Sequence, residues 1–316
     1  EVAQPLTMEQ ALQAGGLDWK IGERDLQTCE DPPSPTTKRK ALVRLDREPG
    51  DPERVLGVVH LGFKPLQNRD GAQLFDAIFG DGKAVYHTGG YLGSGEVVWL
   101  MAKIEKTLTI GEGDLVQPYA LFANSHDGSE AFSICLTTVR VVCQNTLKLA
   151  LREKGLGEQF RRSHQSTFLE HAEAAADFWA STMRQLDRVA ESFKGLASAT
   201  CDDKEFAVFL DRLLPIPPKP RTADRNKAVV KAWDTRVDEA KKARNEIERL
   251  RTEQKGAELK TAHGTLWGAL NAVTEYVDHH RECKADRVAY ALLGDGMDLK
   301  LKAYKLIRDV NNTTAV

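Results

Sequence analysis

The spacing of apolar residues changes along the chain, and the change separates two kinds of predicted element. Up to about residue 138, apolar and polar residues mostly alternate over short runs, which is the period of strands. Turn residues divide three pairs of such runs. These are 41–47 with 54–63, the runs flanking Gly93–Gly95, and the runs flanking Asp127-Gly128. Each pair predicts an antiparallel hairpin.

A short helix and a short strand are predicted before the first hairpin. Thr7 and Gln10 have the spacing of a capping box, which favours the start of a helix. Alternation around Trp19 then predicts a strand. The stretch 29–40, which is rich in Pro, Ser and Thr, is expected to be an exposed loop.

Helical spacing interrupts the hairpins and dominates the second half of the chain. Residues 66–79 place their apolar side chains on one helical face, and Gly80 follows as a stop. The segment "VRVVCQNTLKLALREKG" (139–155) is predicted to be a helix that docks after the last strand. Long amphipathic helices are expected from about residue 164.

These elements predict an α+β fold, with an antiparallel sheet of hairpins packed with helices and a mostly helical C-terminal region. The run "PIPPKP" is the sharpest break, because consecutive prolines end both helices and strands. The predicted organisation has four parts. They are an α+β core domain (1–163), long helices that pack on it (164–214), a proline-rich linker (215–221) and a helical C-terminal region (222–316).

Composition indicates an ordinary globular protein. The chain of 316 residues is 41% hydrophobic and 28% charged, with a formal net charge of -2, which argues against a generally basic nucleic-acid coat. Five scattered cysteines contain no C-x-x-C pair and fit reduced thiols. Without an apolar run of membrane-spanning length or a signal-peptide pattern, we expect a cytoplasmic protein that does not enter membranes.

Three stretches carry candidate chemistry, and each has a plainer interpretation. His126 beside Asp127 has the composition of a base with an orienting carboxylate, but Asp-Gly is also a common hairpin turn. Cys143 near a helix start would be an activated nucleophile, whereas its apolar neighbours favour core packing. His279 and Cys283 in "DHHREC" have the i, i+4 spacing of metal ligands without a second pair, so a solvated face is favoured. No catalytic residue, metal ligand or cofactor is assigned, and a non-enzymatic protein is favoured.

A basic and aromatic constellation points instead to nucleic acid. Cations that alternate with aromatic residues can follow a single-stranded backbone and stack on its bases. The plainer interpretation is a solvated basic face balanced by acids elsewhere. The candidate phosphate contacts are Lys103, Lys106, Arg140, Lys148 and Arg152, and the candidate stacking residues are Trp99 and Tyr91.

The segments "SHDGS", "VRVVCQNTL" and "WGALNAVTEYVDH" carry a resemblance to a known family. The chain resembles phage/plasmid-like proteins that carry domain of unknown function 932, and the resemblance covers nearly its whole length. It implies a phage, prophage or plasmid setting in a bacterial host. The order of predicted elements is also similar to that of RecT/Erf-like single-strand annealing proteins, which form rings or filaments on single-stranded DNA. This second likeness rests on element order and transfers no residue roles.

The leading hypothesis is therefore a DNA-recombination or replication accessory protein that binds single-stranded DNA and forms homo-oligomers. The charged helix at 222–255 would mediate assembly or recruit partners. One rival is an enzyme with a pocket around His126, Asp127, Asn145 and Cys143. Another is a host-interaction factor that acts through its helical tail.

Overall fold

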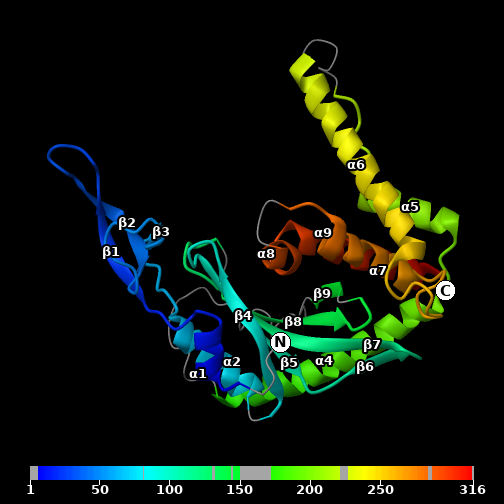
Figure 1. Ribbon diagram of the computed structural model, residues 1–316, viewed down its shortest axis with the longest axis horizontal. Helices are drawn as coiled ribbons and strands as arrows, with labels where there is room; N and C mark the ends of the chain where they lie inside the picture. The colour runs from blue at the N-terminus through cyan, green and yellow to red at the C-terminus, as the bar shows by residue number, and fades with distance from the viewer. Residues whose placement is uncertain are drawn as a thin grey trace. The chain divides into compact units, whose positions relative to one another are not determined.

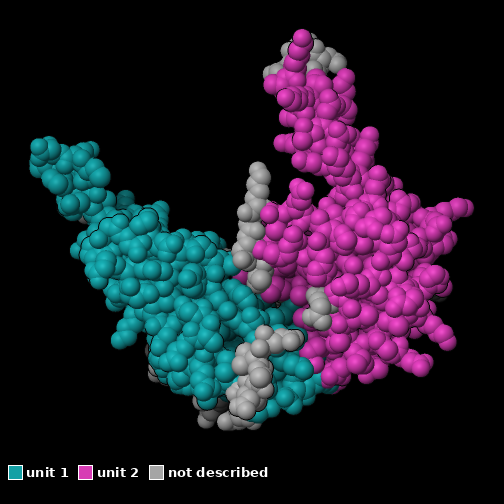
Figure 2. All heavy atoms as spheres, viewed as in Figure 1, with its two compact units in different colours: residues 1–106, 118–137, 149–185 teal, residues 107–117, 138–148, 186–316 magenta. Residues whose placement is uncertain are grey.

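The computed structural model describes residues 6–80, 82–129, 132–143, 145–149, 172–220, 227–283 and 287–314. These residues form two antiparallel sheets and a set of helices, which confirms the α+β prediction and the helical C-terminal region. The chain divides into two compact units (Figure 2). Unit 1 comprises 1–106, 118–137 and 149–185, and unit 2 comprises 107–117, 138–148 and 186–316.

A short helix and a three-stranded sheet open unit 1 (Figure 1). Helix α1 (Met8–Ala14) has the predicted capping box between Thr7 and Gln10. The strands β1 (Ile21–Gln27), β2 (Pro35–Arg44) and β3 (Val55–His60) pair in the order β1-β2-β3. The predicted loop 29–40 is shorter than expected, because β2 already begins at Pro35 and pairs there with Gln27.

The larger sheet contains the other two predicted hairpins. Its strand order is β4-β5-β7-β8-β9, and β6 pairs with β7. The bounds are β4 (Ala84–Leu92), β5 (Val97–Ile104), β6 (Leu108–Gly111), β7 (Asp114–Ser125), β8 (Ser133–Arg140) and β9 (Asn145–Leu149). Strands β7, β8 and β9 each contribute residues to both units.

The helix predicted over 139–155 is wrong for residues 139–143 and 145–149; residues 144 and 150–155 lie outside the described part of the chain. Strand β8 continues to Arg140, a turn follows at 141–143, and β9 runs from Asn145 to Leu149. Valine and threonine favour strands, and sheet pairing outweighs the helical spacing of the apolar residues in this short segment. Arg140 and Lys148 therefore lie on neighbouring strands, not on one face of a helix.

Aromatic residues form the core of unit 1. Helix α2 (Asn68–Phe79) places Phe75 against Phe79, Tyr86 and Phe122, with ring centroids 5.0, 5.9 and 6.2 Å from that of Phe75. Phe79 also contacts Trp179 on α4 (Ala172–Ser198) in an edge-to-face arrangement at 5.8 Å. These contacts attach both helices to unit 1.

Helices make up most of unit 2. After α4 come α5 (Asp203–Leu213), α6 (Lys227–Glu253), α7 (Leu266–Glu275), a π-helical turn (Tyr276–His280), α8 (Arg287–Leu292) and α9 (Asp295–Thr314). Phe193 packs on Trp267 and Tyr304, at centroid distances of 4.6 and 6.0 Å. Helix α5 ends just before the proline run, and Trp233 on α6 donates a hydrogen bond to the Pro217 carbonyl at 2.9 Å. No described helix is long and apolar enough to cross a bilayer.

Candidate nucleic-acid interface

The predicted residues of the β4–β5 hairpin differ in accessibility. Lys103 on β5 is exposed, whereas Trp99 on the same strand is only 7% exposed. Lys106 follows the end of β5 and is half-buried, and Tyr91 on β4 is 38% exposed. Tyr91 can therefore meet a ligand as it stands, while Trp99 is a core residue of its strand.

Arg140 lies in a closed ion pair. Its side chain is 2% exposed, and its Nε and Nη2 atoms donate to the two carboxylate oxygens of Asp114 at 2.7 and 2.8 Å. Burial alone would lower the pKa of this guanidinium, but Asp114 outweighs burial and raises it. A phosphate could reach Arg140 only by displacing a buried carboxylate, so this residue is placed for structural support.

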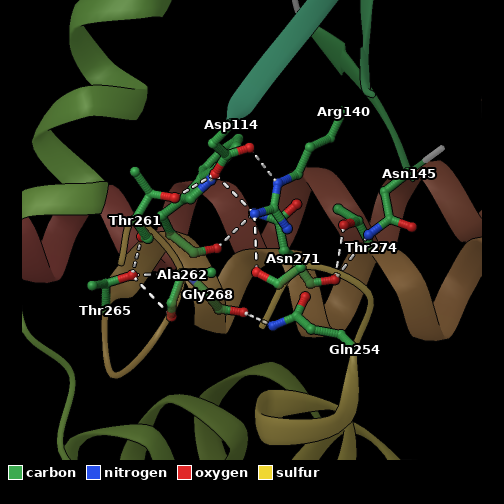
Figure 3. A network of polar contacts seen from close by, with 12 residues as sticks. Asp114, Arg140, Asn145, Gln254, Thr261, Ala262, Thr265, Gly268, Asn271 and Thr274 are labelled. Atoms are coloured by element: carbon green, nitrogen blue, oxygen red, sulfur yellow. Dashed lines mark hydrogen bonds and ion pairs between the residues drawn. The ribbon is translucent and has the colours of Figure 1, made fainter. Parts of the chain in front are cut away.

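Asp114 is the acceptor at the centre of this network (Figure 3). Besides Arg140, its carboxylate accepts hydrogen bonds from the Thr261 hydroxyl at 2.6 Å and the Trp267 indole at 2.9 Å. Burial acts to raise the pKa of Asp114, but these donors together hold it below its ordinary value. The start of β7, the end of β8 and the start of α7 are thereby tied to one carboxylate inside unit 2.

A second buried ion pair lies in unit 2. Lys300 on α9 is fully buried and donates to Asp278 and to the Thr146 hydroxyl, both at 2.7 Å. Asp278 also accepts from the Thr146 backbone at 2.6 Å. Burial lowers the pKa of Lys300, although Asp278 opposes the change. Neither buried cation of unit 2 is presented to a polyanion.

The cavity beside these pairs is small. Its lining includes the polar side chains of Arg140, Asn145, Thr146 and Asn271, together with the larger apolar side chains of Val116, Trp267 and Leu270. Within the described residues, Arg140 Nη1 and Asn145 Oδ1 are buried without a hydrogen-bond partner. The cavity has room for about one water molecule, which is far too little for a nucleotide.

The residues proposed for an enzymatic pocket are engaged in packing and turn contacts. Burial raises the pKa of the Cys143 thiol to about 11, even though Arg140 opposes the shift, so the thiol is neutral near pH 7. His126 is buried, and its Nε2 lies 2.9 Å from Asn68 Oδ1. Asp127 accepts from the Ser129 amide at 2.8 Å, as in an Asx turn. These contacts favour the plainer interpretations of each residue.

The "DHHREC" stretch ends the π-helical turn after α7. His279 Nε2 lies 3.1 Å from the Cys143 carbonyl oxygen, and His280 lies between the carboxylates of Glu246 and Glu275, at 3.1 and 3.8 Å. Across the described part of the chain, no group of three or more His, Cys, Asp or Glu side chains is placed to hold a metal ion.

An accessible basic surface lies instead on the three-stranded sheet of unit 1. In the register of this sheet, Arg24 lies opposite Ala41, which lies opposite Val58, and Arg39 lies opposite His60. Residues opposite each other share a face of the sheet. Val55, paired with Val43, continues the same face. We call the exposed side chains of Arg24, Arg39, Val55, Val58 and His60 the outer face.

The opposite side of this sheet is packed, which fixes the outer face toward solvent. Leu42 is fully buried there, and Lys40 is paired with Glu23 at 2.8 Å. A Cβ at Gly57 would lie 2.5 Å from the Asp127 backbone, so only glycine fits where β3 meets the turn after β7. The rest of unit 1 thus packs against this side of the sheet, where Gly57 meets Asp127.

The outer face combines cations with exposed apolar area. Val55 and Val58 are each 51% exposed. Within the described residues, Arg24 and Arg39 form no salt bridge. None of the register-paired residues on this face is acidic. Such a surface suits an anionic ligand with flat apolar parts.

A cation–aromatic stack lies elsewhere in unit 1. The Arg44 guanidinium is 4.4 Å from the centre of the Trp19 ring and 5.2 Å from that of Tyr91. Arg44 is buried, and Asp46 fixes it through two hydrogen bonds of 3.0 and 2.8 Å. The stack holds the exposed Tyr91 ring in place.

Lys148 and Arg152 complete the predicted set. The backbone of Lys148 is in β9, but its side chain and the whole of Arg152 lie outside the described part of the chain. Of the described side chains in the predicted set, Arg140 lies in a buried ion pair, Trp99 lies in the core of its strand, and Lys103, Lys106 and Tyr91 are at least partly accessible. The outer face was missed because 29–40 was predicted to be a loop, whereas β2 begins at Pro35 and contains Arg39.

A family model described as Domain of unknown function (DUF932) matches residues 55–303. No curated protein and no solved structure matches the chain.

Proposed function

Because the chain belongs to the family defined by domain of unknown function 932, whose description states no activity, we propose a function from its surfaces: it binds single-stranded DNA on the outer face. The observation that carries the proposal is the cluster of Arg24, Arg39 and His60 around exposed Val58, with no acid on that face. Arginines there contact phosphates, and the valines and the arginine planes contact the faces of bases.

The shape of the sheet favours a single strand over a duplex. Three strands about 4.8 Å apart make a surface about 10 Å wide, and Arg39 to Val43 spans about 13 Å. The major groove of a duplex admits a helix or a two-stranded ribbon, whereas the proposed contacts lie across the face of a three-stranded sheet. A single strand can lay its bases on such a face.

A salt titration tests the proposal. We expect a labelled oligothymidine to bind the full chain with an affinity that falls as salt rises from about 50 to 200 mM. The double substitution Arg24→Gln/Arg39→Gln removes two phosphate contacts. It should reduce the slope of log K against log salt by about 1.4, since each contact on a single strand contributes about 0.7.

The matched control removes two charges from another surface. Lys204 on α5 and Lys305 on α9 are exposed, and Lys204→Gln/Lys305→Gln should leave the slope unchanged. Absence of salt-sensitive binding at micromolar protein would refute the proposal. Equal loss in the two double variants would show that binding depends on total charge and not on the outer face.

The resemblance to phage/plasmid-like proteins supports a role for this binding in recombination or replication of a mobile element, in the cytoplasm of a bacterial host. We propose that the chain acts as a homo-oligomer that anneals complementary strands. The assay is the rate at which two complementary labelled oligonucleotides anneal, with and without protein. Acceleration that the Arg24→Gln/Arg39→Gln variant loses supports annealing. Binding without acceleration would leave single-strand protection as the activity and remove the annealing role.

A further inference from the structure

The three-stranded sheet of unit 1 has two edges, and they differ in how they are protected. β1 forms one edge and β3 the other. A sheet edge presents unpaired amides and carbonyls, so another strand can pair with it unless side chains prevent this. On β1, the Gln67 side chain donates to the Ile21 carbonyl at 3.0 Å and accepts from the Ile21 amide at 2.9 Å. The charged residues Glu23, Arg24 and Asp25 follow along the strand. A further strand could pair with β1 only by displacing Gln67 and covering these charges.

The β3 edge has neither form of protection. Its sequence, "VLGVVH", contains no Lys, Arg, Asp, Glu or Pro, which are the residues that keep an edge from pairing. The Leu61 amide donates to the Lys38 carbonyl of β2 at 3.0 Å. Because alternate residues of a strand bond to the same neighbour, Val59 also faces β2, and the amide and carbonyl of Val58 face the free edge. Within the described part of the chain, neither group has a partner outside its own sheet.

The geometry of this edge suits an identical strand. In an antiparallel pair, two residues directly opposite each other can exchange both of their backbone hydrogen bonds. A two-fold axis at Val58 places it opposite Val58 of a second copy, so that each amide meets the other carbonyl. The His60 carbonyl already accepts the Phe63 amide at 2.9 Å, and an axis displaced toward His60 would compete with that bond. The two exposed valine side chains then meet across the axis, and no like charges oppose each other there.

We propose that two copies of the chain pair through their β3 edges, which joins their three-stranded sheets into one continuous antiparallel sheet. This inference rests on the proposed function, because it names the contact through which the homo-oligomer forms. Arg24 and Arg39 lie on the same face as Val58, so the pairing brings the two outer faces onto one surface. A single strand of DNA that follows this surface meets the arginines of both copies.

Disulfide cross-linking of the full chain tests this register without DNA. The exposed Cys29 is first removed by Cys29→Ser. In that background, Val58→Cys places two thiols on residues whose Cα atoms lie about 5.5 Å apart across the axis, within the range of about 4.4–6.8 Å that a disulfide spans. The matched control is Val55→Cys, because Val55 is on the same strand and is also 51% exposed. Three residues from the axis in each copy, the two control thiols lie about 20 Å apart.

With oxidised glutathione as the oxidant, we expect Val58→Cys to form a covalent dimer on a non-reducing gel. Val55→Cys should stay at the level of the Cys29→Ser parent. Absence of a dimer in both cysteine variants, or equal amounts in both, would overturn the inference.

Sedimentation velocity gives a second readout on the unmodified chain, in which the dimer fraction should rise with protein concentration. Val58→Lys sets two like charges opposite each other at the axis and should abolish the dimer. The control Leu45→Lys changes an exposed apolar residue beside Gly22 of β1 and should keep it. A chain that stays monomeric at every concentration, or equal loss in the two lysine variants, would contradict the edge contact.

Adding Arg24→Gln/Arg39→Gln to Val58→Cys separates the two proposals. The added changes should lower oligonucleotide affinity and leave the cross-link unchanged. A cross-link without oligonucleotide binding would refute the proposed function alone, whereas oligonucleotide binding by a strictly monomeric chain would refute the edge contact alone.

Discussion

Replacing Asp114 with alanine should destabilise the protein more than any exposed charge substitution. Asp114 is fully buried and accepts four hydrogen bonds, two of them from a guanidinium that is itself 2% exposed. Removing one member of a buried ion pair leaves the other charge uncompensated, which costs about 3–5 kcal/mol. Domains of ordinary stability have about 5–15 kcal/mol in total, so the loss is a large fraction.

The measurement is guanidinium chloride unfolding followed by circular dichroism. We expect the midpoint of Asp114→Ala to fall well below that of the wild-type chain. Asp211→Ala is the control, because it removes a carboxylate that is 65% exposed and paired with Arg244, and should cost at most about 1 kcal/mol. The double variant Asp114→Val/Arg140→Met should recover part of the loss, since both buried charges are then absent.

Two results would refute this reasoning. If Asp114→Ala cost less than about 1 kcal/mol, the buried pair would contribute no more than a surface pair. If the double variant were as unstable as the sum of Asp114→Val and Arg140→Met, the two side chains would be energetically independent. Either outcome would show that the hydrogen-bond network around Asp114 is not a main source of stability in unit 2.

Four further predictions concern buried side chains of unit 2. The hydrogen-bond donors around Asp114 outweigh burial and hold its pKa below the ordinary value. The ionised Asp114 therefore stabilises the fold above about pH 4, and this stabilisation is lost as the pH falls through the pKa of the folded state. When the unfolding midpoint is measured at decreasing pH, it should fall less steeply in Asp114→Ala than in the wild-type chain. Lys300→Met should cost about 3–5 kcal/mol at pH 7 by leaving Asp278 buried and unpaired, as measured by the same unfolding assay. Burial lowers the pKa of Lys300, so below about pH 10 the unfolded chain binds more protons at this residue than the folded chain does. The free energy of unfolding of the wild-type chain, relative to that of Lys300→Met, should therefore rise from neutral pH toward pH 10. A fall over this range would contradict the prediction. In the native protein, Ellman's reagent should label exposed Cys29 quickly, whereas Cys143, whose pKa burial raises to about 11, should react only on unfolding; rapid labelling of Cys143 would revive the enzymatic rival.

Local signals predicted much of the fold. Thr7 and Gln10 form a capping box whose two hydrogen bonds join residues three positions apart. The spacing of these two residues in the sequence is therefore enough to predict it. Gly93 and Gly128 occupy positive φ angles of 60° and 78° at the expected hairpin turns. Such elements depend on neighbours a few residues apart, so a single sequence reveals them.

The candidate interface depends on contacts that no local pattern encodes. Asp114 neutralises Arg140 across 26 residues, and Thr261 and Trp267 reach the same carboxylate across 147 and 153 residues. In sequence, Arg140 followed by two valines is compatible with an exposed basic surface and equally with a buried ion pair. The packing of α7 against β7 and β8 shows which of the two environments Arg140 has. Arg140 is buried and not exposed to solvent.

The distribution of charge explains why a chain of net charge -2 can still present a basic surface. In unit 2, Arg140 and Lys300 each face a buried carboxylate, so their charges contribute little to the field outside. On the outer face, Arg24 and Arg39 project from a sheet whose acids point the other way, as Glu23 does toward Lys40. Within about one Debye length, a phosphate approaching this face meets positive charge first. Local placement, and not the sum of charges, therefore decides whether the chain can attract a polyanion.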